Sequence, residues 1–268
     1  MRIFLTGATG FIGSRITPLL LEAGHQVLGL TRSDAGAAAR RCRCRGAPRR
    51  PRRPGLAPAR SGEGRRGDPL RLRPRLLPLR KELLERQTEH RGHKLASEDV
   101  FDTTHRLPRK ITEGTGNAVA ERGVNVSYVR LPQVHDTKKQ GLISPLIEIT
   151  RAKGRVAYLG EGQNRWPAAH VSDVALLYKL AVERGESGAR YNAVAEEGIT
   201  MRAIAETLGR RLKLPVVSLT GDEAAAHFGW ITMFAGVDMP ASSAITREKL
   251  GWNPVGPGLL ADLENLEI

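Results

Sequence analysis

Three glycines near the N-terminus have the spacing of a turn that binds phosphate groups. Gly7 allows a tight turn, Gly10 lets the backbone approach a pyrophosphate, and Gly13 lets a helix pack closely on a strand. The N–H groups at the start of the following helix would bind the phosphate oxygens. We therefore predict a dinucleotide-binding turn, which also contains Thr9, Phe11 and Ile12.

The segments on either side of these glycines have the patterns that such a turn needs. Residues 1–5 form a short apolar run of a strand's length, and residues 14–23 follow helical spacing with an apolar stripe on one face. Gly24 ends this helix, and residues 25–30 form a second apolar run. This order of strand, glycine turn, helix and strand predicts the first βαβ unit of a dinucleotide-binding domain.

The residues after the second predicted strand indicate which dinucleotide is bound. An acidic residue there would bond the adenosine ribose hydroxyls, but the chain has Arg32 and Ser33. Arg32 could hold a 2′-phosphate by a charge-assisted hydrogen bond, and Ser33 could add a hydroxyl. This pattern favours NADP(H) over NAD(H). The alternative is that Arg32 only stacks on the adenine or is solvated.

Four later segments carry further motifs. The first is 123–135, which ends in Arg130-Leu131-Pro132-Gln133-Val134-His135. The second is 160–175, which contains His170-Val171-Ser172-Asp173-Val174-Ala175. The third is 191–205, and the fourth is Lys249-Leu250-Gly251-Trp252-Asn253-Pro254. With the glycine turn, and in this order, these motifs resemble those of the extended and atypical short-chain dehydrogenase/reductases, the NAD-dependent epimerase/dehydratase family. The resemblance covers residues 1–38 and about 94–268.

The resemblance implies the fold class and the domains. The implied fold is α/β, a Rossmann-like doubly wound parallel sheet with a small C-terminal α+β substrate lobe. We expect the dinucleotide-binding domain at 1–38 and 94–170. The substrate lobe is expected mostly at 171–268, interleaved with that domain.

Three later segments have regular patterns of their own. Residues 124–129 alternate and are rich in strand-forming side chains, which predicts a strand. Apolar residues at helical spacing predict helices over 173–183 and 198–212. The core of the fold class therefore does not depend on the family resemblance.

The chain lacks the catalytic pair of the resembled family. Those enzymes use Tyr-x-x-x-Lys on a helix, in which the tyrosine is the general acid/base and the lysine lowers its pKa and holds the ribose. None of the four tyrosines has a lysine four residues later. Counted back from Glu113 and from the turn at 121–123, the pair would fall near His105 and Arg109. His105 could exchange a proton and Arg109, or Lys110, could hold the ribose; the alternative is a solvated helix start.

Three other histidines and one turn complete the candidates. The resemblance places Pro132 and Val134 at the turn beside the nicotinamide, and His135 follows them and could face the substrate. His227 could line a substrate cleft or lie in the core. His170 is expected to orient a backbone turn.

Residues 40–91 differ from the rest of the chain. They contain 17 Arg and 1 Lys against 5 acidic residues, so 18 − 5 = +13 of the chain's net charge of +14 lies here. From Thr31 to Asp99 there is no Val, Ile, Phe, Tyr or Trp, so the stretch 39–93 offers no third, fourth or fifth strand. Reading the codons one base forward from Gly64 can restore a strand-like string. We hypothesise that this segment is read out of frame.

Composition excludes several classes of protein. Two cysteines, Cys42 and Cys44, are too few for a disulfide framework or a Cys-only zinc site, and we expect no metal. No run of about 20 apolar residues predicts a membrane span, and the default location is the cytoplasm. The basic segment would contact phosphates non-specifically, but no aromatic residues interleave for base stacking. We therefore expect no specific nucleic-acid partner.

Two functions stay open. The first is an NAD(P)-dependent oxidoreductase or epimerase that acts on a small carbonyl or hydroxyl substrate, as a monomer or homodimer. The second is an NADP(H)-binding protein without catalysis, a redox sensor or scaffold, which the missing Tyr-x-x-x-Lys favours. Binding of NADPH without turnover across a panel of carbonyl compounds would separate the two.

Overall fold

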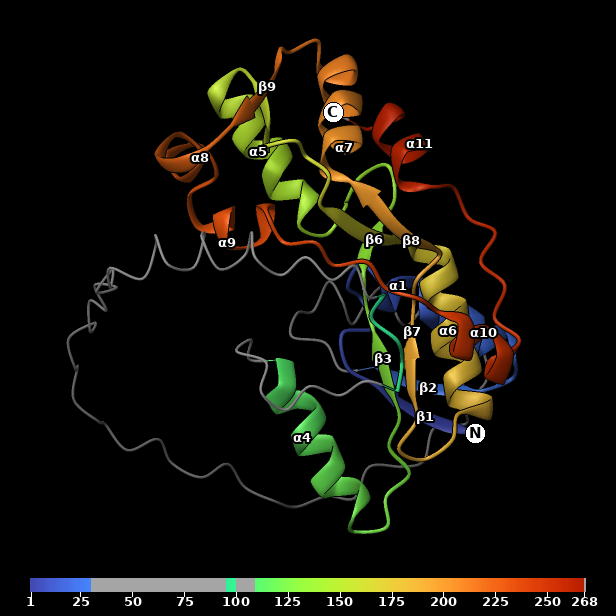
Figure 1. The fold of residues 1–268 in the computed structure, drawn as a ribbon. Coiled ribbons are helices and arrows are strands. Elements are labelled where there is room, and N and C mark those ends of the chain that lie inside the picture. Colours follow the sequence, from blue (N-terminus) through green and yellow to red (C-terminus); the bar gives the residue numbers. More distant parts are fainter. Residues whose placement is uncertain (30–94, 100–108, 268) are drawn as a thin grey trace, which may run out of the picture. The chain divides into compact units, whose positions relative to one another are not determined.

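The computed structural model describes residues 1–29, 95–99 and 109–267 (Figure 1). This part of the chain is an α/β fold in which four of the five strand pairings are parallel. The basic segment at 40–91, Arg32, Ser33, Cys42, Cys44 and His105 lie outside the described residues. The predicted domain boundaries stay a prediction.

The N-terminal part is the predicted βαβ unit. Strand β1 (Arg2–Leu5) pairs in parallel with β2 (Gln26–Gly29), and helix α1 (Gly13–Glu22) joins them. One face of this strand pair packs against Ile16 and Leu20 of α1, together with Ala175 of a later helix. The other face carries Phe4 and Leu28, whose side chains are exposed.

A second pair of strands is tied to a helix by one carboxylate. Strand β3 (Tyr128–Arg130) pairs in parallel with β7 (Arg190–Asn192). Glu113 of helix α4 (Arg109–Ala120) accepts hydrogen bonds from the Nε atoms of Arg130 and Arg190, both at 2.8 Å. The predicted strand at 124–129 is thus corrected to Tyr128–Arg130, because β3 forms strand hydrogen bonds only where β7 lies beside it.

Two further sheets follow. Strand β6 (Arg165–His170) lies between β4 (Gln133–His135), to which it is parallel, and β8 (Glu196–Thr200), to which it is antiparallel. Strand β5 (Val156–Leu159) pairs in parallel with β9 (Val216–Leu219). The last residues of β4 and β6, His135 and His170, are register partners.

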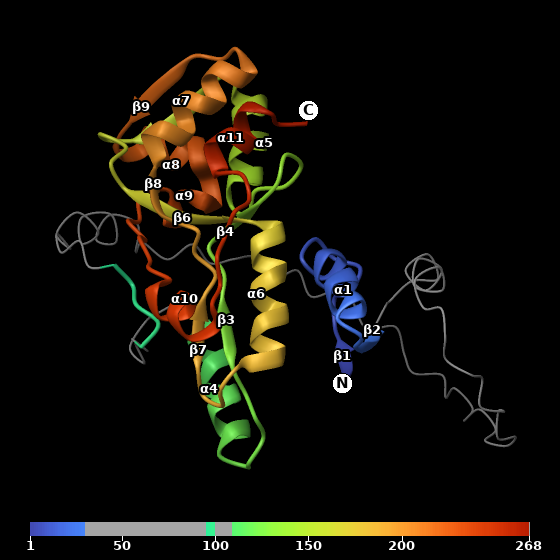
Figure 2. The same cartoon turned by 90° about the vertical axis from the view of Figure 1, so that its right-hand side faces the viewer.

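Helix α6 (Val171–Arg184) confirms the helix predicted at 173–183. The Nδ1 atom of His170 accepts the Ser172 N–H at 3.3 Å and caps this helix, which matches the expected role of His170. Helix α6 packs against α1 (Figure 2). The motif at 249–254 buries Trp252, whose indole N–H donates to the Asp173 carbonyl at 2.9 Å.

Helix α7 (Met201–Leu212) corrects the predicted helix at 198–212 at its start. Residues 198–200 belong to β8, and the Thr200 hydroxyl accepts the Ala203 N–H at 3.2 Å. A threonine side chain that caps the helix stops it from extending backwards into the strand.

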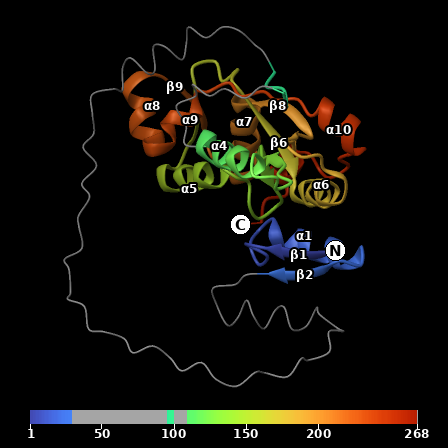
Figure 3. The ribbon, with the colours of Figure 1, turned by 90° about the horizontal axis from the view of Figure 1, so that it is seen from below.

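Shorter helices complete the described chain. Helix α8 packs beside α5 (Figure 3), and the largest apolar cluster forms around Trp166. These remaining elements are α5 (Ile143–Lys153), α8 (Gly221–Phe228), a 3-10 turn (Gly229–Ile231), α9 (Thr232–Ala235), α10 (Ala244–Leu250) and α11 (Leu259–Glu264). No helix within residues 1–29 and 109–267 is long and apolar enough to cross a membrane.

Candidate dinucleotide-binding site

The glycine turn between β1 and α1 requires its glycines for separate reasons. Gly7 has a φ of +68°, a left-handed conformation that favours glycine. A Cβ on Gly13 would overlap the carbonyl oxygen of Gly7, so no side chain fits there. A Cβ on Gly10 would lie 3.2 Å from the same oxygen, and Gly10 is exposed. This geometry agrees with the tight turn, the close backbone approach and the close packing predicted from the spacing.

The start of α1 is open to an anion. Ile12 is the N-cap residue, and no side chain caps the helix. In the described part of the chain, the N–H groups of Phe11, Ile12 and Gly13 donate to no backbone carbonyl, while Gly10 donates to Gly7. Free N–H groups and the helix dipole attract phosphate oxygens. The residues present therefore fit the pyrophosphate of a dinucleotide.

A second segment reaches this turn from far along the chain. Phe11 and Ile12 pack against the apolar cluster that contains Val134. The Nζ of Lys139 lies 5.7 Å from the centre of the Phe11 ring, and Arg15 of α1 lies 3.7 Å from the Asp136 carboxylate. The structure thus brings the glycine turn and the segment of the predicted nicotinamide contact together.

The other predicted cofactor and catalytic residues are only partly described. Pro132 is half-buried between β3 and β4, and Val134 is buried in β4. Arg109 and Lys110 begin α4, but the described structure does not include their side chains. Arg32, Ser33 and His105 lie outside it. The roles of these residues stay predictions.

His135 lies in a buried polar cluster. Its ring is fully buried, and its Nδ1 lies 2.7 Å from Oδ2 of Asp262 in α11. Its Nε2 lies 4.0 Å from Oε2 of Glu196, and His170 lies edge-on with ring centres 5.7 Å apart. Burial lowers the pKa of His135, although Asp262 and Glu196 act to raise it. Contact of His135 with a substrate stays a prediction.

Sequence reasoning missed Asp262 and Glu196. Asp262 lies 127 residues after His135, and Glu196 stands at the start of a strand whose partner is distant in sequence. No local spacing signals either contact. Acidic residues on a short amphipathic helix, such as Asp262 and Glu264 of α11, are typical of a solvated face, so only the packing reveals the contact of Asp262 with His135.

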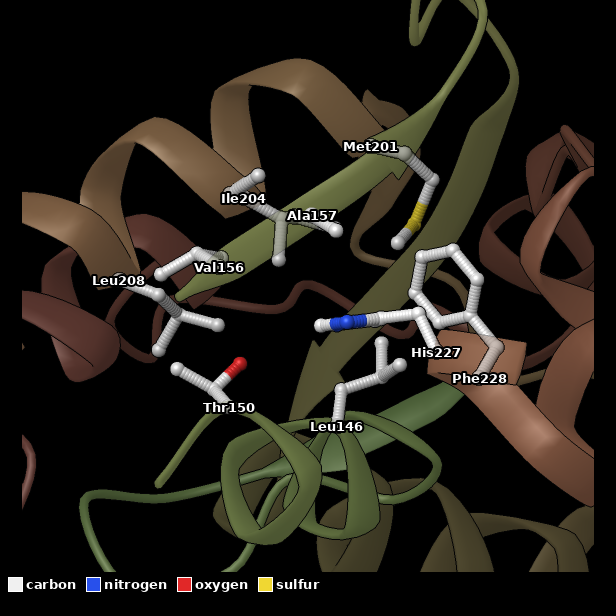
Figure 4. A pocket seen from close by; sticks show the side chains of 10 residues that line it. Leu146, Thr150, Val156, Ala157, Met201, Ile204, Leu208, His227 and Phe228 are labelled. Carbon is white, nitrogen blue, oxygen red and sulfur yellow. The ribbon is translucent and has the colours of Figure 1, made fainter. Parts of the chain in front are cut away.

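His227 lines a small apolar cavity (Figure 4). The cavity of about 10 Å³ has room for about one water molecule, and the His227 ring and the Thr150 side chain point into it. The Nδ1 atom of His227 is buried without a hydrogen-bond partner. Burial lowers the pKa of His227, and Arg155 and Lys153 lower it further. Its contact with a substrate stays a prediction.

The described residues hold no group of histidines, cysteines and acids that could bind a metal ion. What they do hold is a βαβ unit with an open glycine turn. The fold and this turn therefore define an α/β protein of the nucleotide-binding, Rossmann-like class.

Comparisons with known proteins agree with this class. The model of the NAD-dependent epimerase/dehydratase family matches residues 3–48. The chain is 38% identical to the uncharacterized protein C2A9.02 of Schizosaccharomyces pombe and 33% identical to the uncharacterized protein YLL056C of Saccharomyces cerevisiae, and each match covers 98% of both chains. The chain belongs to the NAD-dependent epimerase/dehydratase family.

Solved structures of low sequence identity share the fold. The human epimerase family protein SDR39U1 with NADPH has a TM-score of 0.58 at 20% identity, and the match covers 99% of both chains. The dTDP-glucose 4,6-dehydratase DesIV from Streptomyces venezuelae, with NAD and TYD bound, has a TM-score of 0.58 at 15% identity, and the match covers 99% of this chain and 96% of that one. These matches support the Rossmann-like fold.

Proposed function

We propose that this protein binds NADP(H) at the glycine turn and acts as an oxidoreductase or epimerase on a small carbonyl or hydroxyl substrate. The observation that carries the proposal is the turn itself, with free N–H groups at the start of α1 and no room for a side chain at Gly13. Family membership supports the proposal, as do similar folds solved with NADPH and with NAD.

Each candidate residue has a proposed role in binding or catalysis. The turn binds the pyrophosphate, and the nicotinamide supplies hydride transfer when it is bound. Arg32 and Ser33 are proposed to hold the 2′-phosphate, which selects NADP(H). His105 is proposed to move the proton, and Arg109 or Lys110 to hold the ribose. Pro132 and Val134 are proposed to lie beside the nicotinamide, and His227 to face the substrate side.

Two substitutions test the cofactor proposal by titration with NADPH and NADH. Gly10→Ala adds a methyl group at the exposed turn and should weaken both dinucleotides about tenfold or more, because a close backbone approach is lost. Gly114→Ala in α4 is the matched control, since a Cβ there meets nothing within 4 Å. Arg32→Ala should weaken NADPH much more than NADH. Equal losses would exclude the proposed role of Arg32.

A second candidate function is NADP(H) binding without catalysis. The absence of Tyr-x-x-x-Lys from the whole sequence favours it. The experiment is NADPH oxidation across a panel of small aldehydes, ketones and sugars. The enzyme function is supported if the wild type oxidises NADPH with one of these compounds and His105→Ala abolishes this turnover without changing the affinity for NADPH. Tight binding with no turnover across the panel supports the sensor or scaffold.

A further inference from the structure

The ends of two neighbouring strands meet one buried carboxylate. His135 ends β4, His170 ends β6, and the two are register partners. Oδ2 of Asp262 lies 2.7 Å from Nδ1 of His135 and 3.8 Å from Nε2 of His170. The side chains of His135 and Asp262 are 0% and 6% exposed. Helix α11 thus inserts one charged group between two strand ends.

The hydrogen bonds assign the ring protons of both histidines. The Nδ1 of His170 accepts the Ser172 N–H, so the proton of a neutral His170 lies on Nε2 and faces Asp262. His135 donates its Nδ1–H to the same carboxylate at 2.7 Å. Glu196, the other facing acid, accepts the Leu259 N–H at 2.8 Å. Burial lowers the pKa of His135, and the facing groups Asp262 and Glu196 act to raise it.

The four residues after His135 contact both helix α1 and the glycine turn. Oδ1 of Asp136 accepts the N–H groups of Lys138 and Lys139 at 2.8 and 2.9 Å, which closes a tight turn over residues 136–139. Oδ2 of Asp136 faces Arg15 of α1 at 3.7 Å. The Lys139 side chain lies over the ring of Phe11.

The C-terminal segment holds the other side of this turn. Glu267 donates its N–H to the Thr137 carbonyl at 2.9 Å, and its carboxylate accepts the Thr137 hydroxyl at 2.8 Å. Lys138 pairs with the same carboxylate at 3.2 Å. Residues 136–139 therefore lie between the C-terminal segment and the proposed dinucleotide site.

We propose that the pair His135–Asp262 positions the 136–139 turn on the glycine turn, so that helix α11 sets the dinucleotide affinity. This proposal rests on the proposed function of the glycine turn. In this proposal His135 and Asp262 are positioning residues, which act through Asp136 and Lys139. A buried, hydrogen-bonded pair can fix the end of β4 more rigidly than the exposed contacts of Glu267.

A double-mutant cycle on the full-length protein tests this proposal. His135→Leu and Asp262→Leu should each lower the affinity for NADPH about tenfold, because each breaks the pair and leaves a buried polar partner unsatisfied. The double variant should lose no more than either single variant, because both act through one contact. Asp262→Asn keeps an oxygen acceptor and should stay within about threefold of the wild type.

Hydrogen–deuterium exchange without dinucleotide is the second measurement. The N–H groups of Lys138 and Lys139 should exchange faster in the leucine variants than in the wild type, since the turn loses its support at His135. If a leucine variant does not fold, His135→Ala and Asp262→Ala take its place in the cycle. Thr246→Val is the control. It removes the buried hydroxyl of Thr246 in α10, which donates a hydrogen bond to Glu98, and so it also breaks a buried hydrogen bond to a carboxylate.

The outcomes separate the two proposals. Unchanged NADPH affinity in both leucine variants, additive losses, or an equal loss in Thr246→Val would overturn the positioning role. If the wild type binds no dinucleotide, the proposed function fails. Exchange at residues 136–139 then shows whether the pair still positions the turn: unchanged exchange overturns that role as well, and faster exchange confined to the turn supports it.

Discussion

Two glycines of the same turn are required for different physical reasons. Gly7 needs its left-handed backbone conformation, and a substitution there is strained even though a Cβ would meet nothing within 4 Å. Gly13 has ordinary backbone angles but no space, because a Cβ would overlap the Gly7 carbonyl oxygen. Gly10 is exposed, and a Cβ there would require the Gly7 carbonyl to shift by only a few tenths of an ångström, so it is the glycine of the three at which a substitution disturbs the fold least.

Two buried histidines predict how stability depends on pH. Burial lowers the pKa of both His135 and His227 below the ordinary value of about 6.5. The unfolded chain therefore binds more protons than the native state just below this pH. We expect full stability above about pH 6.5 and a loss as the pH falls towards the lowered values.

Urea unfolding at pH 7.5 and pH 5.5 measures this effect. Between pH 7.5 and pH 5.5, the free energy of unfolding should fall less in His135→Gln and in His227→Gln than in the wild type. The acids with lowered pKa, Glu113, Glu183 and Glu267, titrate below about 4.5 and do not contribute in this window. An unchanged drop in both variants would mean that other groups take up the protons.

At the scale of elements, helix starts show how side chains set boundaries. Helix α7 begins where the Thr200 hydroxyl accepts the Ala203 N–H, and α6 begins where His170 accepts the Ser172 N–H. Helix α1 begins without a side-chain cap. In the two capped helices a side chain accepts one of the first N–H groups, whereas in α1 these groups stay available to the anion that we propose to bind there.

The cap of α7 gives a quantitative prediction. Thr200→Ala should lower the free energy of unfolding by about 1 kcal/mol, because the first turn of the helix loses an acceptor. Thr220→Ala is the matched control, since Thr220 is the N-cap of α8 and makes no side-chain cap hydrogen bond. Guanidinium unfolding of both variants measures the difference. Equal losses would show that the threonines act through something other than capping.

At the scale of the molecule, the sheet of the N-terminal unit is narrow. Strand β1 pairs with β2 alone, and β3 pairs with β7 alone, among the residues that the structure describes. Phe4 and Leu28 are 61% and 64% exposed, on a face that a doubly wound fold would cover. This agrees with a sequence that has no Val, Ile, Phe, Tyr or Trp from Thr31 to Asp99.

The narrow sheet predicts low stability for this chain. We expect thermal unfolding below about 60 °C, because uncovered apolar faces and unpaired strand edges remove burial and hydrogen bonds. Differential scanning calorimetry of the purified chain measures this. A cooperative transition above about 60 °C would contradict it.

Resequencing across codons 38–96, with peptide mass mapping of the same residues, tests the hypothesis of a shifted frame. A shifted frame would restore strand-forming residues and make the enzyme proposal the one to assay. A confirmed Arg- and Pro-rich segment would favour cofactor binding without catalysis.

Local sequence patterns predicted the elements that depend on neighbouring residues. The βαβ unit, the glycine turn and helix α6 follow from spacing within about 30 residues, because turn geometry and helical periodicity are local properties. The family resemblance also followed from short motifs in a fixed order. The bounds of β3 and α7 were only partly predicted, since a strand extends only as far as its partner does.

The contacts between distant groups, in contrast, follow from tertiary packing. Glu113 reaches Arg130 and Arg190, and Asp262 reaches His135 across 127 residues. Packing also buries the ring of His135 and gives it a carboxylate partner, while its predicted contact with a substrate stays a prediction. Burial and hydrogen-bond partners depend on contacts between segments far apart in the chain, so no local pattern encodes them.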